Sequence, residues 1–391
     1  MKKIIFIIVL AALVVMPALS HVALAASAEW TFMVFLNGDN DLDRFSVEDM
    51  REMEKVAFSD KINILVQVDR DELPARRYHI KYRQPGMQED DWGLVSENLQ
   101  ELGEIDMGDY RELVNFFKWS AEKYPAKKYA MVIWNHGNGW AKNRARETFR
   151  GVSFDYQSGN NITTVQLAQA MYEINSLLGK KLDVLAMDAC LMQMMEIAYE
   201  IKEFVGYYVA SEEVVPGKGW PYDLVLDALT REPGMTPGDF SKLVCQAYAK
   251  SYPAQHNTTM SALDCEMIGP LADSLDALCA ALIESVEENR MAMRSAINSV
   301  QYFDYKEHID FGNMIEMIRD KTPTKKVREA AERTLAFFSK AVIQNNTTGQ
   351  GVARAAGLAI YFPKFVFSAE YTKLAFSKLM WDDMVKTFIN N

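Results

Sequence analysis

Hydrophobic residues along this chain form short, nearly unbroken runs, separated by longer stretches with helical spacing. Runs rich in Val, Ile, Phe and Tyr are typical of strands buried on both faces of a sheet. They predict strands at 30–38, 62–69, 129–137, 182–190, 205–213 and 357–363. The stretches between them predict helices at about 44–58, 108–123, 163–177, 191–204 and 238–251. This alternation predicts an α/β sandwich with a mostly parallel central sheet.

Two segments depart from the alternation. Residues 78–84 alternate between polar and apolar side chains, which predicts a small hairpin at the edge of the sheet. From about 264 to 345 the pattern is mainly helical. Because the strand expected at 357–363 returns to the sheet, we interpret this helical portion as an insertion in one domain that spans 26–391.

Residues 1–25 have the layout of a secretory signal peptide. Lys2 and Lys3 precede an apolar run at 4–15, and the small-x-small triplet of residues 23–25 follows. A membrane anchor is the alternative, for which the apolar run is short. Cleavage near Ala25 predicts a secreted or periplasmic protein without stable membrane association.

The net charge of the chain indicates which classes of partner it can bind. The chain carries a formal charge of −11, and removal of a leader with two lysines and no acids leaves −13. An acidic protein is a poor nucleic-acid binder but is compatible with basic peptides. The sequence contains no H-E-x-x-H zinc motif, no P-loop and no G-x-S-x-G serine motif.

Two of the expected strands end in residues suited to one reaction. One strand runs into "WNHGNGW", which includes His136, and another ends in "MDAC", with Cys190 last. Functional groups collect beyond the carboxyl ends of parallel strands, so we expect the two side chains to lie close together. The other three cysteines, Cys245, Cys265 and Cys279, are either plain core residues or include one bridged pair.

This arrangement predicts nucleophilic catalysis by sulfur. A helix that starts directly after Cys190 would lower the pKa of its thiol. An imidazole nearby takes the thiol proton and later returns it to a leaving amine. The backbone N–H groups of Gly137 and Cys190 are candidates for an oxyanion hole.

The motifs resemble those of the clostripain family of cysteine peptidases. They are "MGD" (107–109), "WNHGNGW" (134–140), "DAC" (188–190), "PGKGWPY" (216–222) and "GLAIYFP" (357–363). The resemblance covers about 30–363 and implies a caspase-like three-layer sandwich, because wider relatives include caspases, legumains and gingipains. It implies a Cys190–His136 dyad without an obligatory third carboxylate, and cleavage after Arg or Lys in peptide or protein substrates.

The resemblance also implies how the substrate side chain is bound. Asp188 corresponds to the acid at the base of the family's S1 pocket, where a carboxylate would pair with a guanidinium or an ammonium group. The alternative is that Asp188 caps the following helix. Trp220 or Tyr222 is a candidate pocket wall, and Lys218 is a departure that would weaken selectivity for basic residues.

Family members mature by cutting themselves after a basic residue in the segment that follows the histidine motif. Here that segment contains Arg144, Arg146 and Arg150, of which Arg150 is the best candidate for self-cleavage; an ordinary solvated loop is the alternative.

No metal ligand or cofactor is predicted. Residues 39–43 resemble the start of a calcium loop, but Arg44 and Met50 stand where Gly and Glu are needed. Capping of the next helix by Asp39 or Asp43 is the simpler interpretation, although some relatives need Ca²⁺.

Three functions therefore compete. The leading interpretation is an exported endopeptidase specific for Arg or Lys. The others are a peptidase of the same fold with a different P1 preference, and a catalytically silent envelope binding protein. Retention of His136, Gly137, Asp188 and Cys190 together argues against the silent protein.

Overall fold

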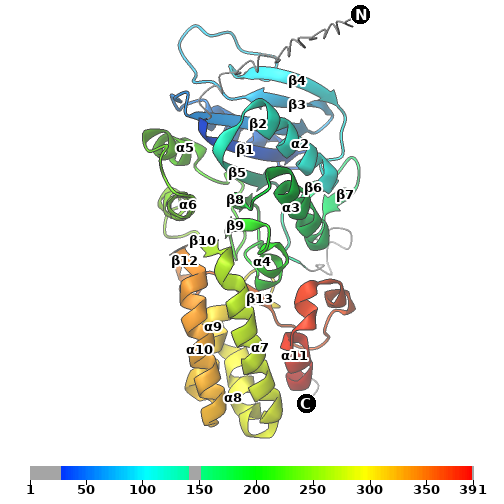
Figure 1. Ribbon diagram of the computed structural model, residues 1–391, viewed down its shortest axis with the longest axis vertical. Helices are drawn as coiled ribbons and strands as arrows, with labels where there is room; N and C mark the ends of the chain where they lie inside the picture. Colours follow the sequence, from blue (N-terminus) through cyan, green and yellow to red (C-terminus); the bar gives the residue numbers. More distant parts are fainter. Residues whose placement is uncertain (1–27, 141–150, 390–391) are drawn as a thin grey trace, which may run out of the picture.

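A nine-stranded sheet forms the centre of the computed structural model, which describes residues 28–140 and 151–389 (Figure 1). Its strand order is β12-β10-β9-β8-β5-β1-β2-β3-β4. The inner strands are parallel: β1 (Ala28–Gly38), β2 (Ile62–Arg70), β5 (Ala126–Trp134), β8 (Leu182–Asp188) and β9 (Val205–Ala210). The edge strands are antiparallel: β3 (Leu73–His79), β4 (Glu97–Gly103), β10 (Thr258–Asp264) and β12 (Val342–Thr348).

Helices cover both faces of the sheet and complete a three-layer sandwich. One face carries α1 (Asp43–Met53), α5 (Tyr222–Arg231) and α6 (Pro237–Ser251); the other carries α2 (Tyr110–Lys123), α3 (Thr164–Leu178) and α4 (Met195–Ile201). Successive strand residues face opposite sides. In β1, Met33 and Phe35 enter one hydrophobic core, whereas Phe32 and Val34 enter the other.

A helical bundle extends beyond the sheet, at the bottom of Figure 1. It contains α7 (Ile268–Glu284), α8 (Val286–Ser299), α9 (Phe311–Lys321) and α10 (Lys325–Ala341), and α11 (Trp381–Ile389) packs against α7 and α8. The bundle lies in sequence between β10 and β12, which are neighbouring strands. No helix within the described ranges is long and apolar enough to cross a membrane.

Short elements complete the chain. They are the pairs β6 (Val152–Asp155) with β7 (Asn160–Ile162) and β11 (His308–Asp310) with β13 (Ala359–Tyr361), and the 3₁₀ helices η1 (Cys265–Met267), η2 (Gln350–Val352), η3 (Ala369–Lys373) and η4 (Ala375–Lys378).

The expected return of residues 357–363 to the central sheet is wrong. Only 359–361 form a strand, β13, which pairs with β11 in a separate two-stranded sheet. The strand that returns to the central sheet is β12, whose sequence VIQNNTT is largely polar. Because β12 lies at the edge of the sheet, it is not enclosed by neighbouring strands on both sides. Its sequence lacks the continuous apolar run by which the strands were predicted.

Two further boundaries differ from expectation. The edge hairpin pairs residues 73–79 with 97–103, so only the first two residues of the segment 78–84 lie in a strand. The helix expected at 191–204 begins at Met195, because Leu191 adopts a left-handed conformation with φ of +62°.

The expected capping of α1 by an aspartate is wrong. Neither Asp39 nor Asp43 caps α1: Asp43 pairs with Arg70 at 2.7 Å, and the N-cap residue is Leu42.

Candidate active site

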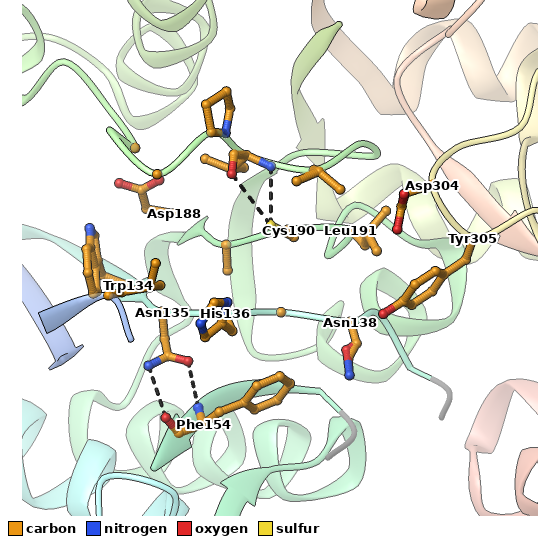
Figure 2. A pocket seen from close by; sticks show the side chains of 18 of the residues that line it. Trp134, Asn135, His136, Asn138, Phe154, Asp188, Cys190, Leu191, Asp304 and Tyr305 are labelled. Atoms are coloured by element: carbon orange, nitrogen blue, oxygen red, sulfur yellow. Dashed lines mark hydrogen bonds between the residues drawn. The ribbon is translucent and has the colours of Figure 1, made fainter. Parts of the chain in front are cut away.

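The strand ends that carry His136 and Cys190 are adjacent in the sheet. In the parallel pair of β5 and β8, Trp134 lies opposite Asp188, and the Asn135 N–H donates to the Asp188 carbonyl at 3.2 Å. His136 and Cys190 each follow two residues after this matched pair. They line one pocket of about 640 Å³ at the carboxyl edge of the sheet, as the sequence led us to expect (Figure 2).

Asn135 fixes the chain just before the histidine. Its side-chain amide donates to the carbonyls of Asn37 at 2.5 Å and Phe154 at 3.2 Å, and its carbonyl accepts from the Phe154 N–H at 2.7 Å. One buried side chain therefore joins the end of β1, the end of β5 and β6. The position of His136 is tied to the central strand of the sheet.

The Cys190 thiol contacts the loop that follows β9. The Val215 N–H donates to Sγ at 3.3 Å, and the thiol donates to the Val215 carbonyl at 3.7 Å. Burial, with a smaller contribution from the charges of Asp188, Glu213 and Asp304, raises the pKa of this thiol to about 11, against the opposing effect of the Val215 N–H. In this state Cys190 is a neutral thiol.

The expected effect of a helix N-terminus on Cys190 is absent. Helix α4 begins at Met195, and the turn between it and the cysteine includes the left-handed Leu191. A helix dipole acts within its first turn. The helix therefore does not stabilise a thiolate at Cys190, and a non-glycine residue with positive φ directly after the cysteine marks a strained turn beside the pocket.

The His136 ring is held on several sides. Its Nε2 lies 2.7 Å from Asp41 Oδ1, and the Tyr156 hydroxyl donates to the same oxygen at 3.4 Å. The ring stacks against Tyr156 with an interplanar angle of 8° and against Phe154 at 24°. Asp41 was not nominated from sequence, because the carboxylate lies 95 positions before the histidine.

Gly137 permits the close approach of the two strand ends. A Cβ atom at this position would lie 2.5 Å from the Cys190 carbonyl oxygen and 2.9 Å from Met192 Cγ. No side chain fits there without displacing the Cys190 backbone. Packing of the two strand ends therefore requires a glycine at position 137, whatever hydrogen bond its N–H makes.

Asp188 lies in the pocket wall with its carboxylate buried. The Trp220 N–H donates to Oδ2 at 2.9 Å and the Tyr222 hydroxyl donates to it at 3.1 Å. Its Oδ1 is buried and has no hydrogen-bond partner within the described residues. Burial raises the pKa of Asp188 to about 7, against the opposing effect of these two donors. The alternative in which Asp188 caps a helix is excluded, since its donors come from residues 220 and 222.

Trp220 and Tyr222 lie behind Asp188, not among the residues that line the pocket. The nearer wall is formed by the loop 214–219, in which a Cβ atom at Gly219 would lie 2.6 Å from Asp188 Oδ2. Lys218, in the same loop, is exposed and does not line the pocket.

Two pocket residues come from the helical portion of the chain. Asp304 and Tyr305 lie in the segment between α8 and β11, and Figure 2 shows them across Cys190 from Asp188. Nothing in their local sequence indicates a role, because they reach the pocket only through the packing of the bundle against the sheet.

The remaining predictions divide between described and undescribed residues. Arg144, Arg146 and Arg150, and the leader 1–25, lie outside the described residues. Cys245, Cys265 and Cys279 are buried as free thiols, so the interpretation as plain core residues is confirmed. Within 28–140 and 151–389, no group of three His, Cys, Asp or Glu side chains is arranged to hold a metal ion.

Comparisons with known proteins agree with this geometry. The sequence model of the clostripain family matches residues 34–387. Clostripain from Hathewaya histolytica is 28% identical over 223 residues, which are 51% of this chain and 42% of clostripain. The alignment therefore spans less than half of that relative.

Two solved structures share the fold. A secreted C11 cysteine protease from Bacteroides thetaiotaomicron, in complex with an irreversible peptide inhibitor, matches with a TM-score of 0.66 and 20% identity. An inactive zymogen C11 protease from Parabacteroides distasonis matches with a TM-score of 0.67 and 19% identity. Each match covers 92% of this chain and 99% of the other.

The expected caspase-like three-layer sandwich is thus confirmed by the sheet order and by these relatives. Because the family model matches from the first strand to the last helix, the chain belongs to the clostripain family, and a cysteine and a histidine line one pocket at the edge of its sheet.

Proposed function

We propose that the chain is an exported cysteine-type endopeptidase that cleaves peptide bonds after Arg or Lys, with Cys190 as the nucleophile and His136 as its base. The observation that carries the proposal is Asp188. Its buried Oδ1 has no hydrogen-bond partner within the described residues, and Asp188 lines the pocket that Cys190 and His136 also line. A buried carboxylate with an unfilled acceptor is a site for a guanidinium or ammonium group.

The reaction follows from these positions. The His136 imidazole takes the proton from Cys190 Sγ, and the thiolate attacks the P1 carbonyl carbon. The N–H groups of Gly137 and Cys190 stabilise the resulting oxyanion. His136 then donates its proton to the leaving amine, which departs and leaves a thioester, and water hydrolyses the thioester with His136 as general base.

A bound P1 cation also assists the sulfur. The charges of Asp188, Glu213 and Asp304 oppose formation of the thiolate. A guanidinium on Asp188 cancels one of these charges, so the correct substrate lowers the free energy of the thiolate at the moment when it is needed.

Fluorogenic peptides that end in Arg, Lys, Asn or Asp test the proposal under reducing conditions. We expect turnover of the Arg and Lys peptides only, complete loss in Cys190→Ala and His136→Ala, and inhibition by a thiol alkylator. Turnover of the Asn or Asp peptide instead would establish a peptidase with a different P1 preference. Absence of turnover with all four would favour the silent binding protein.

We also propose that the protein processes itself after Arg150, with Arg146 and Arg144 as the alternative sites. A peptidase specific for basic residues finds such targets in its own segment 141–150. The purified wild type should yield two fragments on a denaturing gel, whereas Cys190→Ala stays intact. A wild type that remains one chain while it cleaves peptides would disprove self-processing.

Export and the absence of a cofactor complete the proposal. Amino-terminal sequencing of the secreted or periplasmic protein should begin at Ala26 if the leader is removed after Ala25. A calcium chelator should leave peptide turnover unchanged, and a loss that added Ca²⁺ restores would contradict this expectation.

A further inference from the structure

A second cavity of about 1000 Å³ adjoins the catalytic pocket. Its walls come from four segments that are distant in sequence, around Val214, Asn257, Gln301 and Gly351. They belong to the loop after β9, the loop before β10, the segment after α8 and the helix η2. Both the central sheet and the helical bundle contribute to this cavity.

Hydrogen bonds hold these walls together. The Gln301 side-chain amide donates to the Gly351 carbonyl at 2.9 Å, and the Gly351 N–H donates to Asn257 Oδ1 at 2.9 Å. Glu213 Oε1 accepts from the N–H groups of Val214 at 2.8 Å and Asp304 at 3.2 Å. The cavity is therefore a built feature of the fold.

The two cavities share a wall. Val214, Pro216 and Asp304 line both of them, so a chain that leaves the catalytic pocket across the Val214–Pro216 ridge enters the second cavity. Val214 and Tyr302 are large apolar side chains that are 39% and 51% exposed, and both line it. An extended peptide could bury both of them.

The chemistry of the dyad sets the direction of the substrate. The leaving amine must lie near His136, which protonates it, so the residues that follow the cleaved bond start on the side of His136. Residues that precede P1 then run to the opposite side of Cys190. On that side lies the loop of Val215, whose backbone contacts Sγ, and no residue from 126–140 lines the second cavity.

The charges of the cavity differ between its two ends. Glu213 and Asp304 lie at the end shared with the catalytic pocket, whereas Arg354 comes from the segment after η2. Arg354 is exposed and donates to the Ser299 carbonyl at 2.7 Å. Within the described residues no carboxylate lies within 4 Å of its guanidinium.

We propose that this second cavity binds the substrate residues that precede P1, and that Arg354 selects acidic side chains among them. The apolar pair Val214 and Tyr302 then accepts an aliphatic residue next to P1. The inference rests on the proposed cleavage after Arg or Lys, and it adds a second determinant of specificity at a distance from Asp188.

Coumarin peptides of the form acetyl-Xaa-Xaa-Val-Arg, with Xaa as Glu, Gln or Lys in both positions, test this inference. These substrates have no residues after the bond to coumarin, so they report only on the side that precedes it, and mass spectrometry separates coumarin release from any cut after a Lys at Xaa. Wild type should hydrolyse the Glu peptide with a kcat/KM about five times that of the Lys peptide. Arg354→Gln should abolish this ratio and Arg354→Glu should invert it.

The control variant is Arg294→Glu on α8, which makes the same change in net charge at an exposed residue that lines neither cavity. It should keep the wild-type ratio. Acetyl-Arg-coumarin, which cannot reach the second cavity, should be cleaved equally by all variants and so reports on folding.

Equal ratios in Arg354→Glu and Arg294→Glu, or equal cleavage of the Glu and Lys peptides by wild type, would overturn the inference while the proposed function stands. Failure of wild type to cleave acetyl-Arg-coumarin and every longer Arg peptide would instead overturn the proposed function, and the inference with it.

Discussion

At the scale of single residues, Asp41 holds the imidazole of His136, the proposed base. Its Oδ1 lies 2.7 Å from His136 Nε2, and the stacking of Tyr156 limits rotation of the ring. We expect Asp41→Ala to lower kcat about tenfold with little change in KM, because an imidazole that samples other orientations transfers its proton less often. Steady-state kinetics with an Arg peptide measures both constants.

The conservative variant Asp41→Glu distinguishes orientation from substrate binding. A positioning role predicts that it recovers part of the lost kcat, since a carboxylate remains within reach of the ring. A rise in KM with unchanged kcat in Asp41→Ala would instead place Asp41 in contact with the substrate.

Asp188 should make selectivity for Arg depend on pH. Its pKa of about 7 means that the carboxyl group is mostly neutral at pH 5.5 and mostly charged at pH 8.5. A neutral acid attracts a guanidinium weakly, so the ratio of kcat/KM for an Arg peptide to that for its citrulline analogue should rise with pH. Because both peptides use the same dyad, the ratio cancels the titration of Cys190 and His136.

The variant Asp188→Asn gives the control. It should lower the ratio of Arg to citrulline turnover and remove its pH dependence. A wild-type ratio that stays flat between pH 5.5 and 8.5 would show that Asp188 does not titrate in the free enzyme in this range.

At the scale of elements, the proposed mechanism requires the end of β5 to lie close to the end of β8. A methyl group at position 137 would lie 2.5 Å from the Cys190 carbonyl oxygen, so it must separate the two strand ends. We expect Gly137→Ala to reduce kcat/KM about 100-fold, the size of effect seen when one oxyanion donor is displaced.

Gly234→Ala is the matched control, since a Cβ atom there meets no atom within 4 Å and the residue has no positive φ. It should retain full activity. Wild-type activity in Gly137→Ala would mean that the strand ends tolerate separation, and the proposed oxyanion hole would then be wrong.

The elements that were predicted correctly are those whose buried side chains form a regular apolar pattern in the sequence. The inner strands β1, β2, β5, β8 and β9 are apolar on both faces and were predicted. The strand ends led to His136 and Cys190, and the family resemblance led to Asp188. The polar edge strand β12 left no such pattern. Residues 191–194 have helical spacing of apolar side chains, but the left-handed Leu191 breaks the helix, and spacing carries no information about φ.

The parts of the site that were missed depend on tertiary packing. Asp41 meets His136 across 95 residues, and Asp304 reaches the pocket from the segment between α8 and β11, within the helical insertion. Each has an ordinary surface sequence around it. Such contacts are fixed by the docking of whole elements, so a single sequence without the fold cannot indicate them.

At the scale of the whole molecule, buried carboxylates should make the fold more stable in mild acid than in mild base. Burial, together with neighbouring acids that include Glu104 and Asp155, raises the pKa of Asp69 to about 8. Asp39, beside Asp155, has its pKa raised to about 7, chiefly by burial. A raised folded-state pKa contributes stability that is complete below about pH 4 and is lost as the pH rises through the folded value.

Asp69→Asn tests this electrostatic cost directly. Asp69 Oδ2 is buried without a hydrogen-bond partner within the described residues, so an amide of the same shape removes the charge without removing a contact. We expect the variant to gain about 3 kcal/mol in free energy of unfolding at pH 8 and much less at pH 5, measured by denaturant unfolding at both values. An equal gain at both pH values would show that Asp69 does not carry a proton in the folded enzyme at pH 5. The proposed binding of a P1 cation requires a charged Asp188, whereas the fold favours a neutral Asp69, so activity and stability should have their optima on opposite sides of neutrality.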